Sequence, residues 1–108
     1  MNRNHIIYLE RKDSGSWECL TPNGIHATIN KAKGEETLDG SAIQAPMTLN
    51  FDVRYSPLVA AMRMNTQNYR IRYGADGAGR PAYFKVTAYD DYFERRRNVR
   101  LTGVSYRG

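Results

Sequence analysis

The stretch TLNFDVRY, residues 48–55, alternates strictly between apolar and polar side chains. Because successive side chains of a strand point to opposite faces, this period of two gives an extended chain one apolar and one polar face. The apolar face holds Leu49, Phe51, Val53 and Tyr55. The polar face holds Thr48, Asn50, Asp52 and Arg54. The pattern predicts a strand with one face against a core.

Five further stretches repeat this period of two. They are HIIYLER (5–11), IHATINKA (25–32), NYRIRY (68–73), AYFKVTAY (82–89) and NVRLTGVSY (98–106). Six short, half-buried strands at close spacing are typical of antiparallel sheets. We therefore predict an all-β, mainly antiparallel fold: a small barrel or sandwich of about six strands with a long loop. The length of 108 residues favours one domain over residues 1–108.

Local signals in the connections agree with this fold. The turn TPNG (21–24) combines a proline that fixes φ with residues that tolerate positive φ. SPLVAAMRM (56–64) is the single helical candidate, of two turns at most, with Ser56 as N-cap and Pro57 in the first turn. Gly103 inside the last predicted strand indicates a bulge at that point.

The charge of the chain is unevenly distributed. Net charge is +5, but residues 1–50 hold five Lys+Arg against six Asp+Glu, a net of −1, and residues 51–108 hold eleven against five, a net of +6. The basic half is almost entirely arginine, which favours fixed pairing with carboxylates or phosphates. The pattern indicates an acidic partner, with a merely solvated surface as the alternative.

Catalytic and metal-binding patterns are not found in the sequence. Cys19 is the single cysteine, and with His5 and His26 it gives no zinc-ligand spacing and no nucleophile–base pair. No apolar run approaches the roughly 18 residues needed to cross a bilayer, and the apolar run near the N-terminus is too short for a signal-peptide core. We expect no enzyme activity, no cofactor, no metal and no membrane contact, and a product made in the cytoplasm.

The stretch YDDYFERRRNVRL, residues 89–101, joins the last two predicted strands. Its acids and arginines predict a long charged hairpin end. Such an end is either a solvated tip that keeps sheet edges apart or a basic tip that meets phosphate or an acidic protein surface. A metal site at Asp90, Asp91 and Glu94 is disfavoured because the adjacent arginines already compensate these carboxylates.

The order of these features resembles the bacteriophage head–tail joining family, the head-closure or stopper proteins of tailed-phage necks. An opening strand, a Trp-containing turn (GSWECL) and a second strand precede the best-matching part. The segments that carry the resemblance are TLNFDVRYSP (48–57), RIRYG (70–74), YFKVTAYDDYFERRR (83–97) and VRLTGV (99–104). Each segment is short, and their order and spacing are what is informative.

The resemblance implies a non-enzymatic barrel subunit of a ring between the portal and adaptor and the tail, which retains packaged DNA and docks the tail. Implied partners are further copies of the chain, portal and adaptor proteins, tail proteins and, by non-specific proximity, packaged DNA. The implied location is the virion neck, after synthesis in the bacterial host. The implied channel loop includes Lys33, Glu35, Glu36 and Asp39. Candidate ring-interface or DNA-facing residues are Arg54, Arg70, Arg72, Arg95, Arg96, Arg97 and Arg100.

Three alternative functions remain open from the sequence. A tail-terminator or other tail-completion protein would share most of these features. A small-barrel nucleic-acid-binding module would bind free DNA or RNA with a steep salt dependence. A RelE-type endoribonuclease toxin is also small and basic, but it places two helices ahead of its sheet, where this chain has Pro22 and four glycines (Gly15, Gly24, Gly34 and Gly40) that disfavour long helices.

Overall fold

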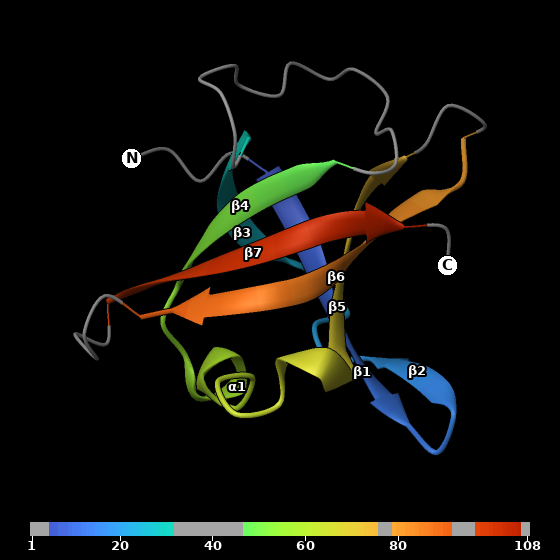
Figure 1. Cartoon of the computed structure of the whole chain (residues 1–108), viewed down its shortest axis with the longest axis horizontal. Coiled ribbons are helices and arrows are strands. Elements are labelled where there is room, and N and C mark those ends of the chain that lie inside the picture. Colours follow the sequence, from blue (N-terminus) through green and yellow to red (C-terminus); the bar gives the residue numbers. More distant parts are fainter. Residues whose placement is uncertain (1–4, 32–46, 76–78, 92–96, 107–108) are drawn as a thin grey trace.

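The computed structural model describes residues 5–31, 47–75, 79–91 and 97–106. These residues form seven strands, a single helical turn and a short 3-10 turn (Figure 1). The strands are β1 (His5–Asp13), β2 (Ser16–Cys19), β3 (Ile25–Lys31), β4 (Thr48–Arg54), β5 (Tyr69–Ala75), β6 (Pro81–Asp90) and β7 (Asn98–Tyr106). The turns are α1 (Pro57–Ala60) and η1 (Thr66–Asn68).

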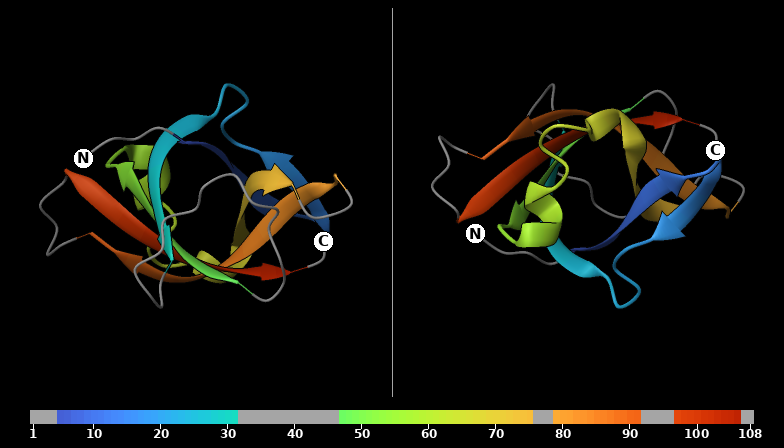
Figure 2. Two further views of the ribbon diagram at one scale, coloured as in Figure 1. Left: turned by 90° about the horizontal axis from the view of Figure 1, so that it is seen from above. Right: turned by 90° about the horizontal axis from the view of Figure 1, so that it is seen from below.

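Six of the strands close into a barrel. Their order is β1-β3-β4-β7-β6-β5, and β5 pairs back with β1, so the circle is complete. All the pairings are antiparallel. Seen from above and below, the strands surround a common axis (Figure 2). The predicted all-β antiparallel fold is therefore confirmed, and it is a barrel with one additional strand, β2.

The interior of the barrel is filled by the apolar halves of the alternating strands. Phe51 and Phe84 meet edge to face at its centre, with ring centroids 5.2 Å apart. Such filling is expected of a barrel with few strands. The buried set comprises Ile7, Leu9, Ala27, Ile29, Leu49, Phe51, Val53, Val59, Met62, Tyr69, Ile71, Ala82, Phe84, Val86, Val99 and Leu101. One barrel is thus a packed core, without room for a polymer along its axis.

The single helical turn starts where its capping signals place it. The Ser56 hydroxyl accepts a hydrogen bond from the Val59 amide at 3.2 Å, and Pro57 occupies the first position. Val59 and Met62 are buried and contribute to the core at the end of the barrel where α1 lies (Figure 1). The predicted short helix is confirmed at its start and is one turn long.

Strand β2 was not predicted from the sequence. It forms a hairpin with the second half of β1, and the turn residues Ser14 and Gly15 have φ values of 51° and 85°. Positive φ at both central residues is the geometry of a two-residue hairpin turn. Four residues, Ser16–Cys19, are too few to show a period of two, so the sequence was interpreted as a turn containing Trp17.

β1 pairs with β3 through its first residues and with β2 through its last, and the TPNG turn separates the two pairings. At this break a side-chain hydrogen bond takes the place of a backbone one. The Gly24 amide bonds the Thr21 carbonyl at 2.8 Å, which closes the predicted turn. The Leu9 amide has no backbone partner at this break and donates to the Thr21 hydroxyl at 2.9 Å. Because Thr21 is buried, its hydroxyl satisfies the Leu9 amide where water has little access.

Replacing Thr21 with valine tests this repair. Thr21→Val keeps the shape and leaves the buried Leu9 amide without its acceptor, so we expect a loss of about 1–3 kcal/mol in the free energy of unfolding. Urea denaturation measures this loss. Thr21→Ser retains the hydroxyl and serves as the control. Equal stability of the two variants would contradict the role of the hydroxyl.

The bulge predicted at Gly103 lies on the neighbouring strand. β7 keeps strict alternation through Gly103, whereas the register of β6 shifts between Val86 and Ala88, opposite Gly103 and Thr102. Gly103 points inward, where a Cβ atom would lie 2.9 Å from Phe84 Cβ and 3.3 Å from Phe51 Cε2. The glycine is needed for the close approach of the two phenylalanines, and the prediction of a bulge in β7 was wrong.

We expect Gly103→Ala to destabilise the barrel by about 1–3 kcal/mol, because a methyl group would overpack the contact between Phe51 and Phe84. Thermal and urea unfolding would detect this change. Lys85→Ala removes an exposed side chain from the paired strand and should stay within about 0.5 kcal/mol of the parent. A Gly103→Ala protein as stable as Lys85→Ala would contradict the packing argument.

Candidate functional site

Arg70 lies at the centre of a cluster on the outer wall where β5 closes onto β1. Its Nε atom donates to Glu10 Oε1 at 2.6 Å, and Nη1 donates to the Tyr106 hydroxyl at 3.2 Å. The guanidinium carbon lies 4.3 Å from the Trp17 ring centroid and 3.8 Å from that of Tyr83. We call these five residues the Arg70 cluster. They come from β1, β2, β5, β6 and β7.

The electrostatics of the cluster keep Arg70 charged and fixed. Burial alone would lower the pKa of Arg70, but the hydrogen bonds to Tyr106 and Glu10 outweigh it and raise the pKa above its ordinary value. Only 11% of the side chain is exposed. The Arg70 cation therefore makes its contacts within the protein, where it links the β1–β2 hairpin to β6 and β7 of the barrel.

Arg72, another candidate ring-interface or DNA-facing arginine, also contacts an aromatic ring. Its guanidinium carbon lies 4.4 Å from the Tyr8 ring centroid, and its Nε atom lies 3.9 Å from Glu10 Oε2. About a third of the side chain, 35%, remains exposed. Tyr8 and Arg72 are register partners across β1 and β5, so this stacking reinforces the closing seam.

Arg100 pairs with Asp52 across β4 and β7. Its Nε and Nη2 atoms donate to the two carboxylate oxygens at 2.8 and 2.9 Å, a bidentate arrangement. Asp52 lies on the predicted polar face, yet its side chain is only 2% exposed. Beside this pair the Thr102 hydroxyl donates to Asn50 Oδ1 at 2.9 Å. On this part of the wall, side-chain hydrogen bonds connect β4 to β7.

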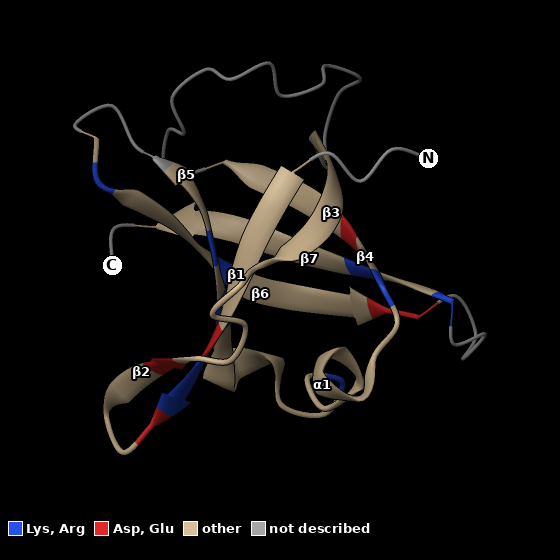
Figure 3. Cartoon of the chain, turned by 180° about the vertical axis from the view of Figure 1, so that it is seen from behind, with Lys and Arg blue, Asp and Glu red and all other residues tan. Residues whose placement is uncertain are grey.

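Arg54 and Arg97 differ from the other described candidates because both are exposed and lie at the α1 end of the barrel. Arg54 ends β4 opposite Asn98, and the next residue, Tyr55, bonds the Arg97 carbonyl at 3.0 Å. Figure 3 shows charged residues gathered on the β1–β2 hairpin and along the walls of β4 and β7. We call Arg54, Arg97 and the exposed His26 the basic rim.

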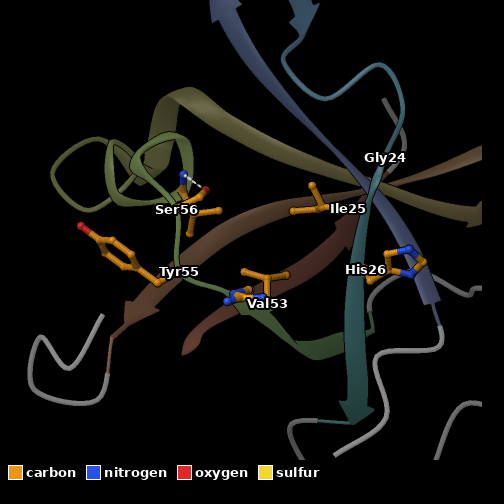
Figure 4. Close-up of a pocket in the computed structure, with 8 residues that line it drawn as sticks. Gly24, Ile25, His26, Val53, Tyr55 and Ser56 are labelled. Carbon is orange, nitrogen blue, oxygen red and sulfur yellow. Dashed lines mark hydrogen bonds between the residues drawn. The ribbon is translucent and has the colours of Figure 1, made fainter. Parts of the chain in front are cut away.

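Two members of the basic rim, Arg54 and His26, line a pocket of about 460 Å³ between the start of β3 and the end of β4. Ile25, Val53 and Val59 supply apolar surface, while Ser56 and Tyr55 come from the link into α1 (Figure 4). In this view Ile25 points toward the pocket and His26 points away from it. The pocket lining is Gly24, Ile25, His26, Val53, Arg54, Tyr55, Ser56 and Val59, which includes no acidic residue.

The remaining candidate residues lie outside the described residues. These are Lys33, Glu35, Glu36 and Asp39 of the predicted channel loop and Arg95 and Arg96 of the arginine stretch. Their roles, and the assignment of Arg54, Arg70, Arg72, Arg97 and Arg100 to a ring or DNA surface, stay predictions. The described part of the arginine stretch does form the base of the β6–β7 hairpin, as expected.

Burial affects two tyrosine hydroxyls away from these clusters. The Tyr73 hydroxyl lies 2.8 Å from His5 Nδ1, and burial raises the pKa of Tyr73. Burial raises the pKa of Tyr89 as well, with Asp91 adding to the effect. Both phenols therefore stay neutral at physiological pH. No three His, Cys, Asp or Glu side chains within the described ranges are placed to hold a metal ion.

Comparison of the chain with family models, with curated proteins and with solved structures gives no match. The resemblance to head–tail joining proteins therefore rests on the order and spacing of sequence features. Among the helices of the described residues, none is long and apolar enough to cross a membrane.

Sequence reasoning missed four members of the Arg70 cluster: Glu10, Trp17, Tyr83 and Tyr106. The period of two puts Glu10 on an outward face, and β1 and β5 then align it directly with Arg70. The sequence does show an acid in the first strand and an arginine in a later one. It does not show that these two strands pair or in which register. Strand β2, which supplies Trp17, was itself not predicted.

We expect Arg70→Met to lower the free energy of unfolding by about 3 kcal/mol, because it leaves the buried Glu10 carboxylate without its partner. The double variant Arg70→Met plus Glu10→Gln should regain part of the lost free energy of unfolding, because it no longer buries an unpaired carboxylate. Urea denaturation followed by the fluorescence of Trp17, the sole tryptophan, measures both. Arg11→Met removes an exposed arginine of the same hairpin and is the control. A loss no larger than that control would contradict the assigned role.

Proposed function

We propose that this chain is a non-enzymatic, ring-forming subunit of the neck of a tailed phage or prophage, between the portal and adaptor and the tail. One observation carries the proposal beyond the sequence. The four segments that resemble head–tail joining proteins include β4 and the greater part of β5, β6 and β7, and these strands lie side by side in the order β4-β7-β6-β5. Segments scattered over about 60 residues thus form one continuous wall of the barrel.

The packed interior supports a role carried by the outer surface. Sixteen apolar residues fill the barrel and its α1 end, so a nucleic acid has no path through a single chain. A channel for DNA would have to lie between several copies. Closed rings arise from heterologous contacts, in which one patch of each subunit meets a different patch of the next. Such contacts require two complementary surfaces on the same chain.

The basic rim at the α1 end is one candidate for such a surface. Three of the acids in residues 1–50, Glu35, Glu36 and Asp39, fall within one five-residue stretch of the sequence and are the candidate partner for it. Charge complementarity steers assembly and fixes register more than it adds affinity. A basic rim also tolerates DNA phosphates, whose contact is independent of base sequence. The neck role uses both properties.

Deletion of the gene from its parent phage or prophage tests the proposal. We expect electron micrographs of the lysate to show separate heads and tails, with heads that have lost DNA, and expression of the intact chain in trans should restore joined virions. Complementation with Arg54→Glu plus Arg97→Glu should fail or be strongly reduced, because it reverses the exposed charge of the rim. Lys85→Glu, an exposed charge reversal in β6, is the matched control.

Normal joined virions after deletion would overturn the proposal. Filled heads accompanied by tails of abnormal length would instead favour a tail-terminator. Tight binding of free DNA or RNA by the isolated chain, falling steeply with salt, would favour a nucleic-acid-binding module.

A further inference from the structure

The wall of the barrel opens between the start of β3 and the end of β4. The pairing of these strands runs from Lys31 opposite Leu49 to Ala27 opposite Val53 and stops there. Beyond this point Gly24–His26 on one side and Arg54–Ser56 on the other border the pocket of about 460 Å³. We call this pocket, with its flanking strand ends, the open seam.

The open seam combines three features that suit an extended peptide. The diverging strand ends carry backbone N–H and C=O groups in strand geometry, which an added chain can pair with. The pocket presents Ile25, Val53 and Val59 to an apolar side chain, and its volume lies in the range of roughly 300–1,000 Å³ usual for ligand pockets. The exposed residues Arg54 and His26 also belong to the lining and can receive carboxylates beside that apolar group.

This chain carries a segment of matching composition. Residues 35–39, EETLD, place Leu38 among three acids. The segment lies in the connection from Lys31 to Met47, which leaves β3 and enters β4 at the ends opposite the open seam. A contact between this segment of one copy and the open seam of another would join two different surfaces, which is a heterologous contact.

We propose that the open seam of one copy binds residues 35–39 of a second copy, with Leu38 in the pocket and the acids against Arg54 and His26. The ring of the proposed function supplies the setting, and this contact would be one of its interfaces. In this contact the Leu38 side chain would displace water from the apolar lining of the pocket. The carboxylates of Glu35, Glu36 and Asp39 would neutralise the positive charge of the rim. The seam has no acid of its own among its lining residues, so the acids of the bound segment would face no repulsion there.

Disulfide trapping between two full-length variants tests the contact. Both carry Cys19→Ser, one adds Leu38→Cys, and the other adds Ile25→Cys, whose side chain points toward the pocket, with a tag that separates the heterodimer by mass. Disulfides form only when the two Cα atoms approach within about 7 Å. We expect the heterodimer to form at least about five times faster than in the control mixture of Leu38→Cys with Thr87→Cys, because binding raises the effective concentration of the thiols.

Two further variants make the test specific. Neutralising the segment with Glu35→Gln, Glu36→Gln and Asp39→Asn in the Leu38→Cys chain should slow trapping toward the control rate, and so should Arg54→Glu in the Ile25→Cys chain. Circular dichroism first establishes that each variant is folded. Trapping equal to the Thr87→Cys control would overturn the proposal. So would a disulfide that forms within one chain carrying both Leu38→Cys and Ile25→Cys but never between chains.

The two proposals fail in different ways. Control-level trapping together with unjoined heads and tails after gene deletion would leave the neck role standing and reject this interface. Efficient trapping together with normal virions after deletion would keep self-association through the open seam and reject the neck role.

Discussion

The pairing of β1 with β5 is the constraint on which the rest of the structure depends, because it converts an open sheet into a barrel. The paired residues are about 60 positions apart in the chain, so this seam carries a large loop-closure cost. At its centre Glu10 lies directly opposite Arg70 and forms an ion pair with it, and the Arg70 guanidinium contacts the rings of Trp17 and Tyr83. Burying two charges is costly unless geometry and additional hydrogen bonds compensate, and here Tyr106 and the two rings supply that compensation. The cluster thereby specifies which strands meet at the closing seam.

The six main strands were predictable because each is long enough to show its period of two and each buries one face. The structure places all six over the expected residues, and Ser56 and Pro57 start α1 as their capping chemistry indicates. The arginine stretch could likewise be recognised as the connection of a hairpin, since a run of charged residues separates the alternating stretches 82–89 and 98–106. Local chemistry and alternation determine these features, so one sequence is sufficient to find them.

Features that depend on register could not be predicted from one sequence. Alternation places Asp52 and Arg70 on outward faces, yet both are nearly enclosed because partners from distant strands lie over them. The bulge was assigned to β7 from Gly103, whereas the glycine provides space for Phe84 and the bulge lies on the paired strand β6. The hairpin β1–β2 had a signal in Ser14-Gly15, whose positive φ values suit a two-residue turn. The pocket at the open seam required knowing where the pairing of β3 and β4 ends.

The use of arginine inside the wall changes which charges are available for partners. Arg70, Arg72 and Arg100 have protein partners, so the net charge of the basic half overstates the cationic surface open to an acidic partner. Of the predicted ring or DNA-facing arginines within the described ranges, Arg54 and Arg97 are the two classed as exposed, and both lie at the α1 end. Because the packed barrel is rigid, this end and the opposite end keep a fixed relation, set by the seven-residue lengths of β3 and β4. A contact between opposite ends repeats with the same rotation at every subunit, and whether it closes into a ring or continues as a filament is decided by that rotation alone.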